Sequence, residues 1–158
     1  MDWPNNKKFA FTIIDDTDDS FVDNIKPIYG LLNDLNIKTT KTVWVYPSRN
    51  MYIGYSLMDE DYYRFILDLR DTGFEIALHN VGSGAFYREE IINGIEVFKE
   101  KIGYYPKIQV NHGDNTDNLY WGSKRFVNPL KFVYKIFHKE KFYEDEIGHP
   151  QFWGDINQ

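Results

Sequence analysis

Cysteine is absent from the 158-residue sequence, which excludes disulfide bonds, cysteine-ligated zinc sites and thiol nucleophiles. Long apolar runs are also absent, and none approaches the roughly 18 residues of a membrane-spanning helix. Residues 1–8 lack the apolar stretch of a secretory signal peptide. We therefore expect a cytoplasmic protein without a membrane partner.

Positive charge is in the minority. The chain has 18 lysine and arginine residues against 24 aspartate and glutamate residues, for a net charge of −6. An acidic chain binds phosphate backbones poorly, so we expect no nucleic-acid partner. The 42% of hydrophobic and 27% of charged residues are a globular balance. Aromatic residues make up 18%, enough to build a core and to leave rings for a planar or sugar-like ligand.

Short apolar segments alternate with amphipathic ones along the chain. Segments rich in β-formers predict strands at residues 9–14, 39–46, 74–78 and 107–111, the first of them buried. Apolar residues at helical spacing predict helices at 21–35, 58–72, 89–102 and 129–138. In the first helix, one apolar face is formed by Ile25, Ile28, Leu31, Leu32 and Leu35.

Strands that alternate with helices imply parallel pairing through right-handed crossovers. Four such units fill nearly the whole chain, whereas a closed eight-unit barrel takes about 250 residues. The sequence thus predicts an α/β fold, either a small open sheet or the N-terminal part of a barrel. Because residues 152–158 end without a helix cap, we expect a single domain over residues 1–158 that is incomplete at its C-terminus. The sheet edge left open after the fourth strand predicts self-association.

Polar side chains follow three of the predicted strands. The acidic run 15–19 follows the first strand, His79 follows the third, and the segment 111–114 follows the fourth. The carboxyl ends of parallel strands meet at one edge of a sheet, where reactive residues gather. Carboxylates and imidazoles together suit a divalent metal ion. The adjacent carboxylates of Asp15 and Asp16 also require a counter-ion or a shifted pKa.

Each of these polar residues also has a purely structural interpretation. The acidic run is then a solvated loop in which Asp19 or Ser20 caps the following helix. His79 and His112 are then hydrogen-bonded residues at the ends of strands. Ordinary surface residues are expected at His138 and His149.

Three segments resemble motifs of the polysaccharide deacetylases, the NodB-homology family or carbohydrate esterase family four. Residues 13–17, Ile-Ile-Asp-Asp-Thr, lie where that family carries Thr-Phe-Asp-Asp-Gly. Residues 73–83 resemble its second motif, Gly-His-Glu-Ile-Gly-x-His-Ser/Thr-x-x-His. The family's third motif would fall on residues 111–113, Asn-His-Gly. The resemblance covers residues 8–114.

The resemblance implies a distorted (β/α) barrel of the NodB-homology type that removes acetyl groups from carbohydrate with a divalent metal, usually zinc. It implies that Asp15 is the base and that Asp16 and His79 bind the metal. In such chemistry a metal activates water and polarises the acyl oxygen, while a carboxylate takes the proton of the attacking water. From their places at the same edge, His112 or Asp18 is the expected third ligand. Contacts with the carbohydrate substrate are expected from Ser83, Asn111 and Asp114.

The sequence departs from the family pattern at several positions. Ser83 stands where the family has its second metal-binding histidine. Ile13 and Thr17 replace the threonine and glycine that flank the aspartate pair. The Arg-Pro-Pro-Tyr of the third motif is absent, and the last two motifs would lie beyond Gln158.

Two other functions remain open. The pattern Asp16-x-Asp18-x-Ser20 resembles the Asp-x-Asp-x-Thr motif of haloacid-dehalogenase-like phosphatases, although that interpretation leaves His79 unexplained. Alternatively, the chain is a degenerate, non-catalytic fragment that binds carbohydrate. The aromatic residues available for stacking on sugar rings are Trp44, Tyr46, Tyr52, Tyr55 and Trp121.

Overall fold

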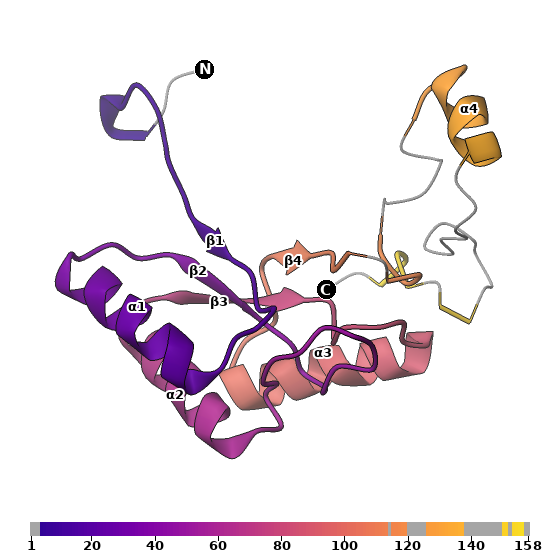
Figure 1. The fold of residues 1–158 in the computed structure, drawn as a ribbon. Coiled ribbons are helices and arrows are strands. Elements are labelled where there is room, and N and C mark those ends of the chain that lie inside the picture. The colour runs from indigo at the N-terminus through magenta and orange to yellow at the C-terminus, as the bar shows by residue number, and fades with distance from the viewer. Residues whose placement is uncertain (1–3, 114, 120–125, 138–149, 152, 157–158) are drawn as a thin grey trace.

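A four-stranded parallel sheet forms the centre of the protein (Figure 1). The computed structural model describes residues 4–113, 115–119, 126–137, 150–151 and 153–156. In it the strands are β1 (Ile14–Asp15), β2 (Thr40–Val43), β3 (Glu75–His79) and β4 (Gln109–Val110). They follow one another across the sheet in chain order, and every neighbouring pair is parallel. The α/β class and the parallel β/α units predicted from the sequence are confirmed.

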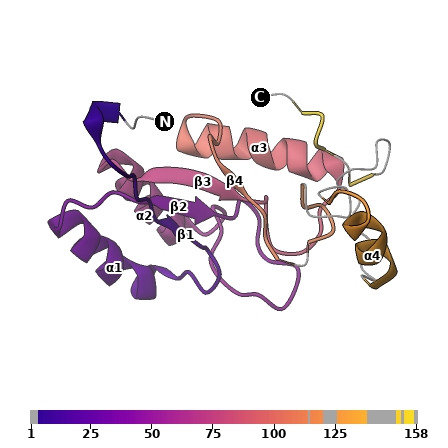
Figure 2. The same cartoon turned by 90° about the horizontal axis from the view of Figure 1, so that it is seen from above.

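Three helices cover one face of this sheet. They are α1 (Val22–Asp34), α2 (Glu60–Asp71) and α3 (Arg88–Ile102), and they lie together beneath the strands in Figure 1 and beside them in Figure 2. A short helix α4 (Leu130–Phe137) stands apart from this layer, past the carboxyl ends of the strands (Figure 2), and a 3-10 turn η1 (Pro4–Asn6) precedes β1. The sheet curls away from the helices, so β1 and β4 rise at its two edges as in half of a barrel.

The core lies between the sheet and the three helices. Alternate residues of β2 and β3 point toward the helices, as the period of a strand requires. The buried apolar residues of this core include Val43, Val45, Ile76, Leu78, Tyr62, Ile66, Ile95 and Phe98. No helix among the described residues is both long and apolar enough to cross a bilayer.

The segment before β1 differs from the sequence-based prediction of a buried strand over residues 9–14. Only Ile14 and Asp15 pair with β2, and the side chains of Phe9 and Phe11 are 76% and 82% exposed. The buried strand predicted there is therefore wrong for residues 9–13. The physical reason is that β1 lies at the edge of the sheet, where none of the described strands or helices covers it.

The apolar face predicted for the first helix is split in the structure. Ile25 and Tyr29 of α1 are buried against the sheet, whereas Ile28, Leu31 and Leu35 are each 57–59% exposed. These three residues form a stripe beside the buried one, since they recur at intervals of three and four. Among the described elements, α2 is the helix that packs beside α1, and the exposed stripe lies away from the buried one.

Candidate functional site

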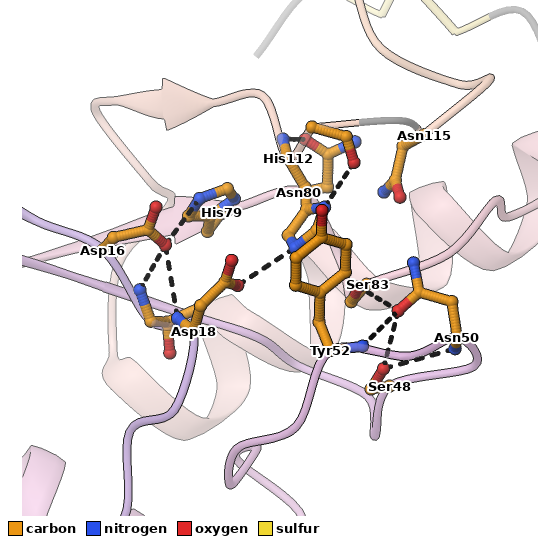
Figure 3. Close-up of polar contacts among 12 residues, drawn as sticks. Asp16, Asp18, Ser48, Asn50, Tyr52, His79, Asn80, Ser83, His112 and Asn115 are labelled. Carbon is orange, nitrogen blue, oxygen red and sulfur yellow. Dashed lines mark hydrogen bonds and ion pairs between the residues drawn. The ribbon is translucent and has the colours of Figure 1, made fainter.

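The strand register brings the carboxyl ends of the four strands to one edge. Asp15 pairs with Lys41, Val43 with Leu78, and His79 with Val110. Figure 3 shows five of the polar residues singled out in the sequence gathered at this edge: Asp16, Asp18, His79, Ser83 and His112. Backbone pairing between the strands therefore brings the loops that carry the site to the same edge of the sheet.

Asp16 and His79 form the first pair at this edge. The Oδ1 atom of Asp16 lies 2.9 Å from Nε2 of His79, whose side chain is almost completely buried. The same oxygen accepts the backbone N–H of Thr17 at 2.6 Å. The hydrogen bond with His79 holds the pKa of Asp16 well below its usual range. The structure therefore brings together two of the predicted metal ligands.

Asp18 and His112 form a second pair beside the first. Nε2 of His112 lies 3.0 Å from Oδ1 of Asp18, and its Nδ1 lies 2.6 Å from the carbonyl oxygen of Gly113. The rings of His79 and His112 are 5.2 Å apart between centroids. Two carboxylate–imidazole pairs from three different strand ends thus lie next to each other (Figure 3).

Aromatic residues enclose the ring of His112. Tyr52 meets it edge to face with 4.6 Å between centroids, and Trp44 lies 5.7 Å away. Nε1 of Trp44 and Nδ1 of His79 are buried without a hydrogen-bond partner among the described residues. A buried polar atom without a partner costs free energy, so each of these nitrogens keeps an unused capacity for a hydrogen bond.

Asp15 has a different environment from Asp16. Its Oδ2 lies 3.0 Å from Nζ of Lys41 and accepts the hydroxyl hydrogen of Tyr29 at 2.8 Å. Lys41 is fully buried, and burial lowers its pKa while the charge of Asp15 opposes the change. The counter-ion that the aspartate pair requires is therefore Lys41, which sequence reasoning did not identify. A lysine within the segment 39–46, which is otherwise made of strand-forming residues without charge, is the signal that could have pointed to it.

Lys41 also accounts for Ser20, one of the two residues considered as a cap for the first helix. Nζ of Lys41 donates to Oγ of Ser20 and to the backbone oxygen of Asp16, each at 2.8 Å. The residue before α1 is Phe21, whose N–H is accepted by Oδ1 of Asn24 at 2.9 Å. Ser20 therefore fixes the acidic loop to β2, and the prediction that it caps the helix is wrong.

Ser83 lies at the edge of the same cluster, in the loop after β3. It is completely buried, and its hydroxyl donates to Oδ1 of Asn50 at 2.6 Å. The same oxygen accepts the hydroxyl of Ser48 and the backbone N–H of Tyr52, each at 3.1 Å. Ser83 thus fastens the loop after β3 to the loop after β2.

The loop after β4 is held by amide side chains that sequence reasoning missed. Oδ1 of Asn80 accepts the backbone N–H of His112 at 2.9 Å, and its Nδ2 donates to Asn118 at 2.8 Å. Asn115 accepts the N–H of Gly84 at 2.8 Å. The density of asparagine and aspartate over residues 111–118 is the signal that could have revealed this network.

Two predicted substrate contacts fall in this loop. Asn111 uses its side-chain amide to bind the backbone of Leu119, donating to the oxygen at 2.6 Å and accepting the N–H at 3.3 Å. Asp114 lies outside the described residues.

Asp117, a further acidic residue of this loop, is buried, and burial raises the pKa of its carboxyl to about 7.

The donor types at this edge suit a divalent cation, because carboxylate oxygen and neutral imidazole nitrogen are both common zinc ligands. Within the described ranges, no three histidine, cysteine, aspartate or glutamate side chains are arranged as a metal-binding group. The four side chains are instead paired with one another, as Asp16 with His79 and Asp18 with His112. The donor atoms are therefore of the right type for a metal ion, and binding one would replace the Asp16–His79 and Asp18–His112 hydrogen bonds with bonds to the metal.

Comparison with known proteins gives no match: no family model, no curated protein and no solved structure is similar to this chain.

Proposed function

We propose that the chain is a metal-dependent hydrolase of the polysaccharide deacetylase type, which removes acetyl groups from carbohydrate. The observation that carries the proposal is the placement of the Asp16–His79 and Asp18–His112 pairs at one edge of a parallel sheet. Reactive residues of parallel α/β proteins gather at this edge. The type of reaction is taken from the resemblance of residues 13–17 and 73–83 to deacetylase motifs.

Asp16, His79 and His112 are the residues that would hold the divalent ion, most simply zinc. A bound ion of this kind supplies Lewis acidity to the acyl oxygen and lowers the pKa of water. His112 reaches the ion only by giving up its contact with Asp18, since its Nδ1 already faces the oxygen of Gly113. Asp18 would then be available as a further ligand, and the oxygen of Gly113 would orient the imidazole.

Asp15 is the general base in this proposal. Its side chain is 40% exposed, and Lys41 and Tyr29 both bind its Oδ2. Among the described contacts, Oδ1 of Asp15 is left to accept a proton. Lys41 fixes the direction of the carboxylate from the buried side, which keeps the base in one orientation.

The topology favours this proposal over a phosphatase of the haloacid-dehalogenase type. In this chain the described strands follow one another across the sheet in sequential order, and α1, α2 and α3 lie on one face of the sheet. A doubly wound sheet reverses its strand order at a switch point and carries helices on both faces. His79 and His112 also have no role in the phosphatase interpretation.

A non-catalytic, carbohydrate-binding protein is the second candidate function. It is favoured by Ser83, which occupies the position of a histidine in the deacetylase motif and is fully engaged with Asn50. Metal content separates the two candidates. A deacetylase of this type holds about one zinc ion per chain, whereas a degenerate site holds none.

The test combines elemental analysis with an assay for acetate released from acetylated chito- and xylo-oligosaccharides. We expect Asp16→Asn and His79→Ala to lose both metal and activity. Asp15→Asn should keep the metal and lose roughly 10²–10⁴-fold in rate, the usual contribution of a general base. Asp19→Asn, which removes an exposed charge from the same loop, is the matched control. Equal metal content in all four variants would exclude the proposed site.

A further inference from the structure

The loop between β2 and α2 carries almost no charge. Its residues 46–58 contain Arg49 and no other lysine, arginine, aspartate or glutamate. Nη2 of Arg49 lies 2.6 Å from Oε1 of Glu90, so this single charge is already paired. The other side chains of the loop are mostly hydroxyl, amide, aromatic and aliphatic groups. A surface of this composition suits an uncharged ligand rich in hydroxyl groups better than it suits an ion.

The side chain of Asn50, in this loop, is held in one orientation by its oxygen. Oδ1 accepts the hydroxyl of Ser83 at 2.6 Å and the hydroxyl of Ser48 at 3.1 Å. It also accepts the backbone N–H of Tyr52 at 3.1 Å. The backbone oxygen of Ser83 accepts the N–H of Arg49 at 2.8 Å, which fastens the loop a second time. Three donors use up the two lone pairs of Oδ1, so the nitrogen of the amide is the part left to bind a ligand.

The amide nitrogen of Asn50 faces outward. Figure 3 shows Nδ2 pointing away from the three donors that surround Oδ1. Asn50 is exposed, and among the contacts of the described residues Nδ2 has no hydrogen-bond partner. Its two N–H groups require an acceptor, such as the oxygen of a sugar hydroxyl or of an acetyl group. Because the amide is fixed before binding, little rotamer entropy is lost when it donates to a ligand.

Tyr52 lies between Asn50 and the candidate metal residues (Figure 3). Its ring meets the ring of His112 at 73°, with 4.6 Å between centroids, and the residue is only half-buried. Its hydroxyl takes part in no hydrogen bond with the described residues. Tyrosine combines an apolar ring, which packs on the C–H groups of a sugar, with a hydroxyl that can form a hydrogen bond. Tyr52 thus connects His112 with Asn50.

The other aromatic residues considered for stacking on sugar rings are placed differently. Trp44 is completely buried, and Tyr46 stacks on Phe86 with 5.9 Å between centroids. Tyr55 packs edge to face on Phe21 at 5.0 Å. Trp121 lies outside the described residues. Of the described candidates, Tyr52 is therefore the one that both contacts His112 and is partly exposed.

We propose that Tyr52 and Asn50 form a subsite for a second sugar unit, next to the unit whose acetyl group reacts at the paired aspartates and histidines. This inference rests on the proposed function. A substrate held at both places passes over the ring of Tyr52, which packs on the second sugar, and offers an oxygen to Nδ2 of Asn50. A single acetylated sugar fills the reacting place alone. The preferred substrate is therefore an uncharged acetylated oligosaccharide, and a monosaccharide is a poorer one.

The test compares N-acetylglucosamine with its β-1,4-linked tetramer, and O-acetylated xylose with acetylated xylotetraose, by acetate release and by titration calorimetry. Wild type should favour a tetramer over its monomer at least about 10-fold in kcat/KM and in affinity. Asn50→Asp keeps the acceptor oxygen and removes both N–H donors, so it should lower this ratio roughly 5–10-fold. Tyr52→Leu removes the ring and should lower the ratio roughly 10-fold.

Two matched variants serve as controls. Asn33→Asp makes the same change of charge at an exposed position of α1, where Oδ1 accepts from Nζ of Lys38 at 2.7 Å. Tyr105→Leu removes an exposed tyrosine before β4, whose hydroxyl donates to Glu96 at 2.9 Å. Both should leave the ratio of tetramer to monomer unchanged. Circular dichroism verifies that each variant is folded.

Calorimetry separates the subsite from the reaction. A wild type that releases no acetate, yet binds a tetramer more tightly than its monomer and loses this preference in both variants, would refute the reaction and support the subsite. Failure to bind or hydrolyse either tetramer would overturn the subsite, as would equal values for tetramer and monomer. A ratio that either Asn50→Asp or Tyr52→Leu leaves at its wild-type value would overturn it as well.

Discussion

Nε2 of His112 lies 3.0 Å from Oδ1 of Asp18, and this contact joins the loop after β4 to the loop after β1. The two residues are 94 positions apart in the chain. His112 is almost fully buried, whereas about a third of the Asp18 side chain is exposed. The contact therefore links the loops of the two outer strands, β1 and β4, past the carboxyl ends of β2 and β3.

The first prediction concerns the coupling between these two side chains. A double-mutant cycle with Asp18→Ala and His112→Ala should give an interaction free energy of about 1–2 kcal/mol, as for a partly buried hydrogen bond to a charged group. The measurement is chemical denaturation of the four proteins. Asp19→Ala in place of Asp18→Ala is the control, and it should couple to His112 by much less. Additive effects of Asp18 and His112 would show that the contact contributes nothing to stability.

The second prediction concerns Lys41. Lys41→Met keeps the length of the buried stem but leaves Asp15 without its counter-ion and Ser20 without a donor. We expect a loss of about 2–3 kcal/mol in the free energy of unfolding, less than for a fully buried pair because Asp15 can regain water. Arg64→Met breaks the ion pair with Glu60 on the exposed face of α2, and it should change stability little. Equal effects of the two substitutions would contradict a special role for Lys41.

The fold was largely predictable from local pattern. The helix expected at 89–102 is observed as Arg88–Ile102, and the strand expected at 74–78 is observed as Glu75–His79. Amphipathic periodicity and the glycines at 73 and 103, both with positive φ, fix these boundaries locally. The exposure of Phe9 and Leu31 could not be predicted in this way, because it depends on which elements lie beside them at the edge of the sheet.

The candidate site was predictable only in part. The rule that polar residues gather at the carboxyl ends of parallel strands anticipated the approach of Asp16 and His79. It could not say which of two adjacent carboxylates faces the histidine, because that depends on side-chain direction. Lys41 and Asn80 were missed because each owes its role to partners that are distant in the sequence.

The third prediction compares two helical glycines. A Cβ atom at Gly94 in α3 would lie 2.6 Å from a methyl carbon of Val81, whereas at Gly30 in α1 nothing lies within 4 Å. Gly94→Ala should therefore destabilise the protein by about 1–3 kcal/mol through overpacking. Gly30→Ala should stabilise it by about 0.5–1 kcal/mol, the usual gain of alanine over glycine in a helix. Thermal and chemical unfolding give both values, and the same sign for both substitutions would refute the packing of α3 on the loop after β3.

The last prediction concerns Asp117, whose carboxyl lies within the asparagine network behind the site. Its Oδ2 accepts the N–H of Phe86 at 3.2 Å, and its Oδ1 faces Nδ2 of Asn80 at 3.3 Å. These two hydrogen bonds favour the ionised form but do not offset burial, so the pKa rises from 3.8 to about 7. Trp153 donates to the backbone oxygen of Asp117 at 2.7 Å, so this position also ties the C-terminal segment to the loop.

The raised pKa makes stability depend on pH in a definite direction. Between about pH 4 and 7 the folded protein keeps the proton on Asp117 while the unfolded chain has lost it, so folding takes up a proton. The free energy of unfolding therefore falls as pH rises through this window, by about 2–4 kcal/mol, and levels off above pH 7. Asp16 does not affect this window, because its lowered pKa confines its contribution to stability to lower pH.

The measurement is urea denaturation at intervals from pH 5 to 8. Asp117→Asn should remove the decline relative to wild type, and Asp71→Asn on the surface should retain it. A difference between wild type and Asp117→Asn that stays constant with pH would show that Asp117 is ionised throughout this range, with its hydrogen bonds outweighing its burial.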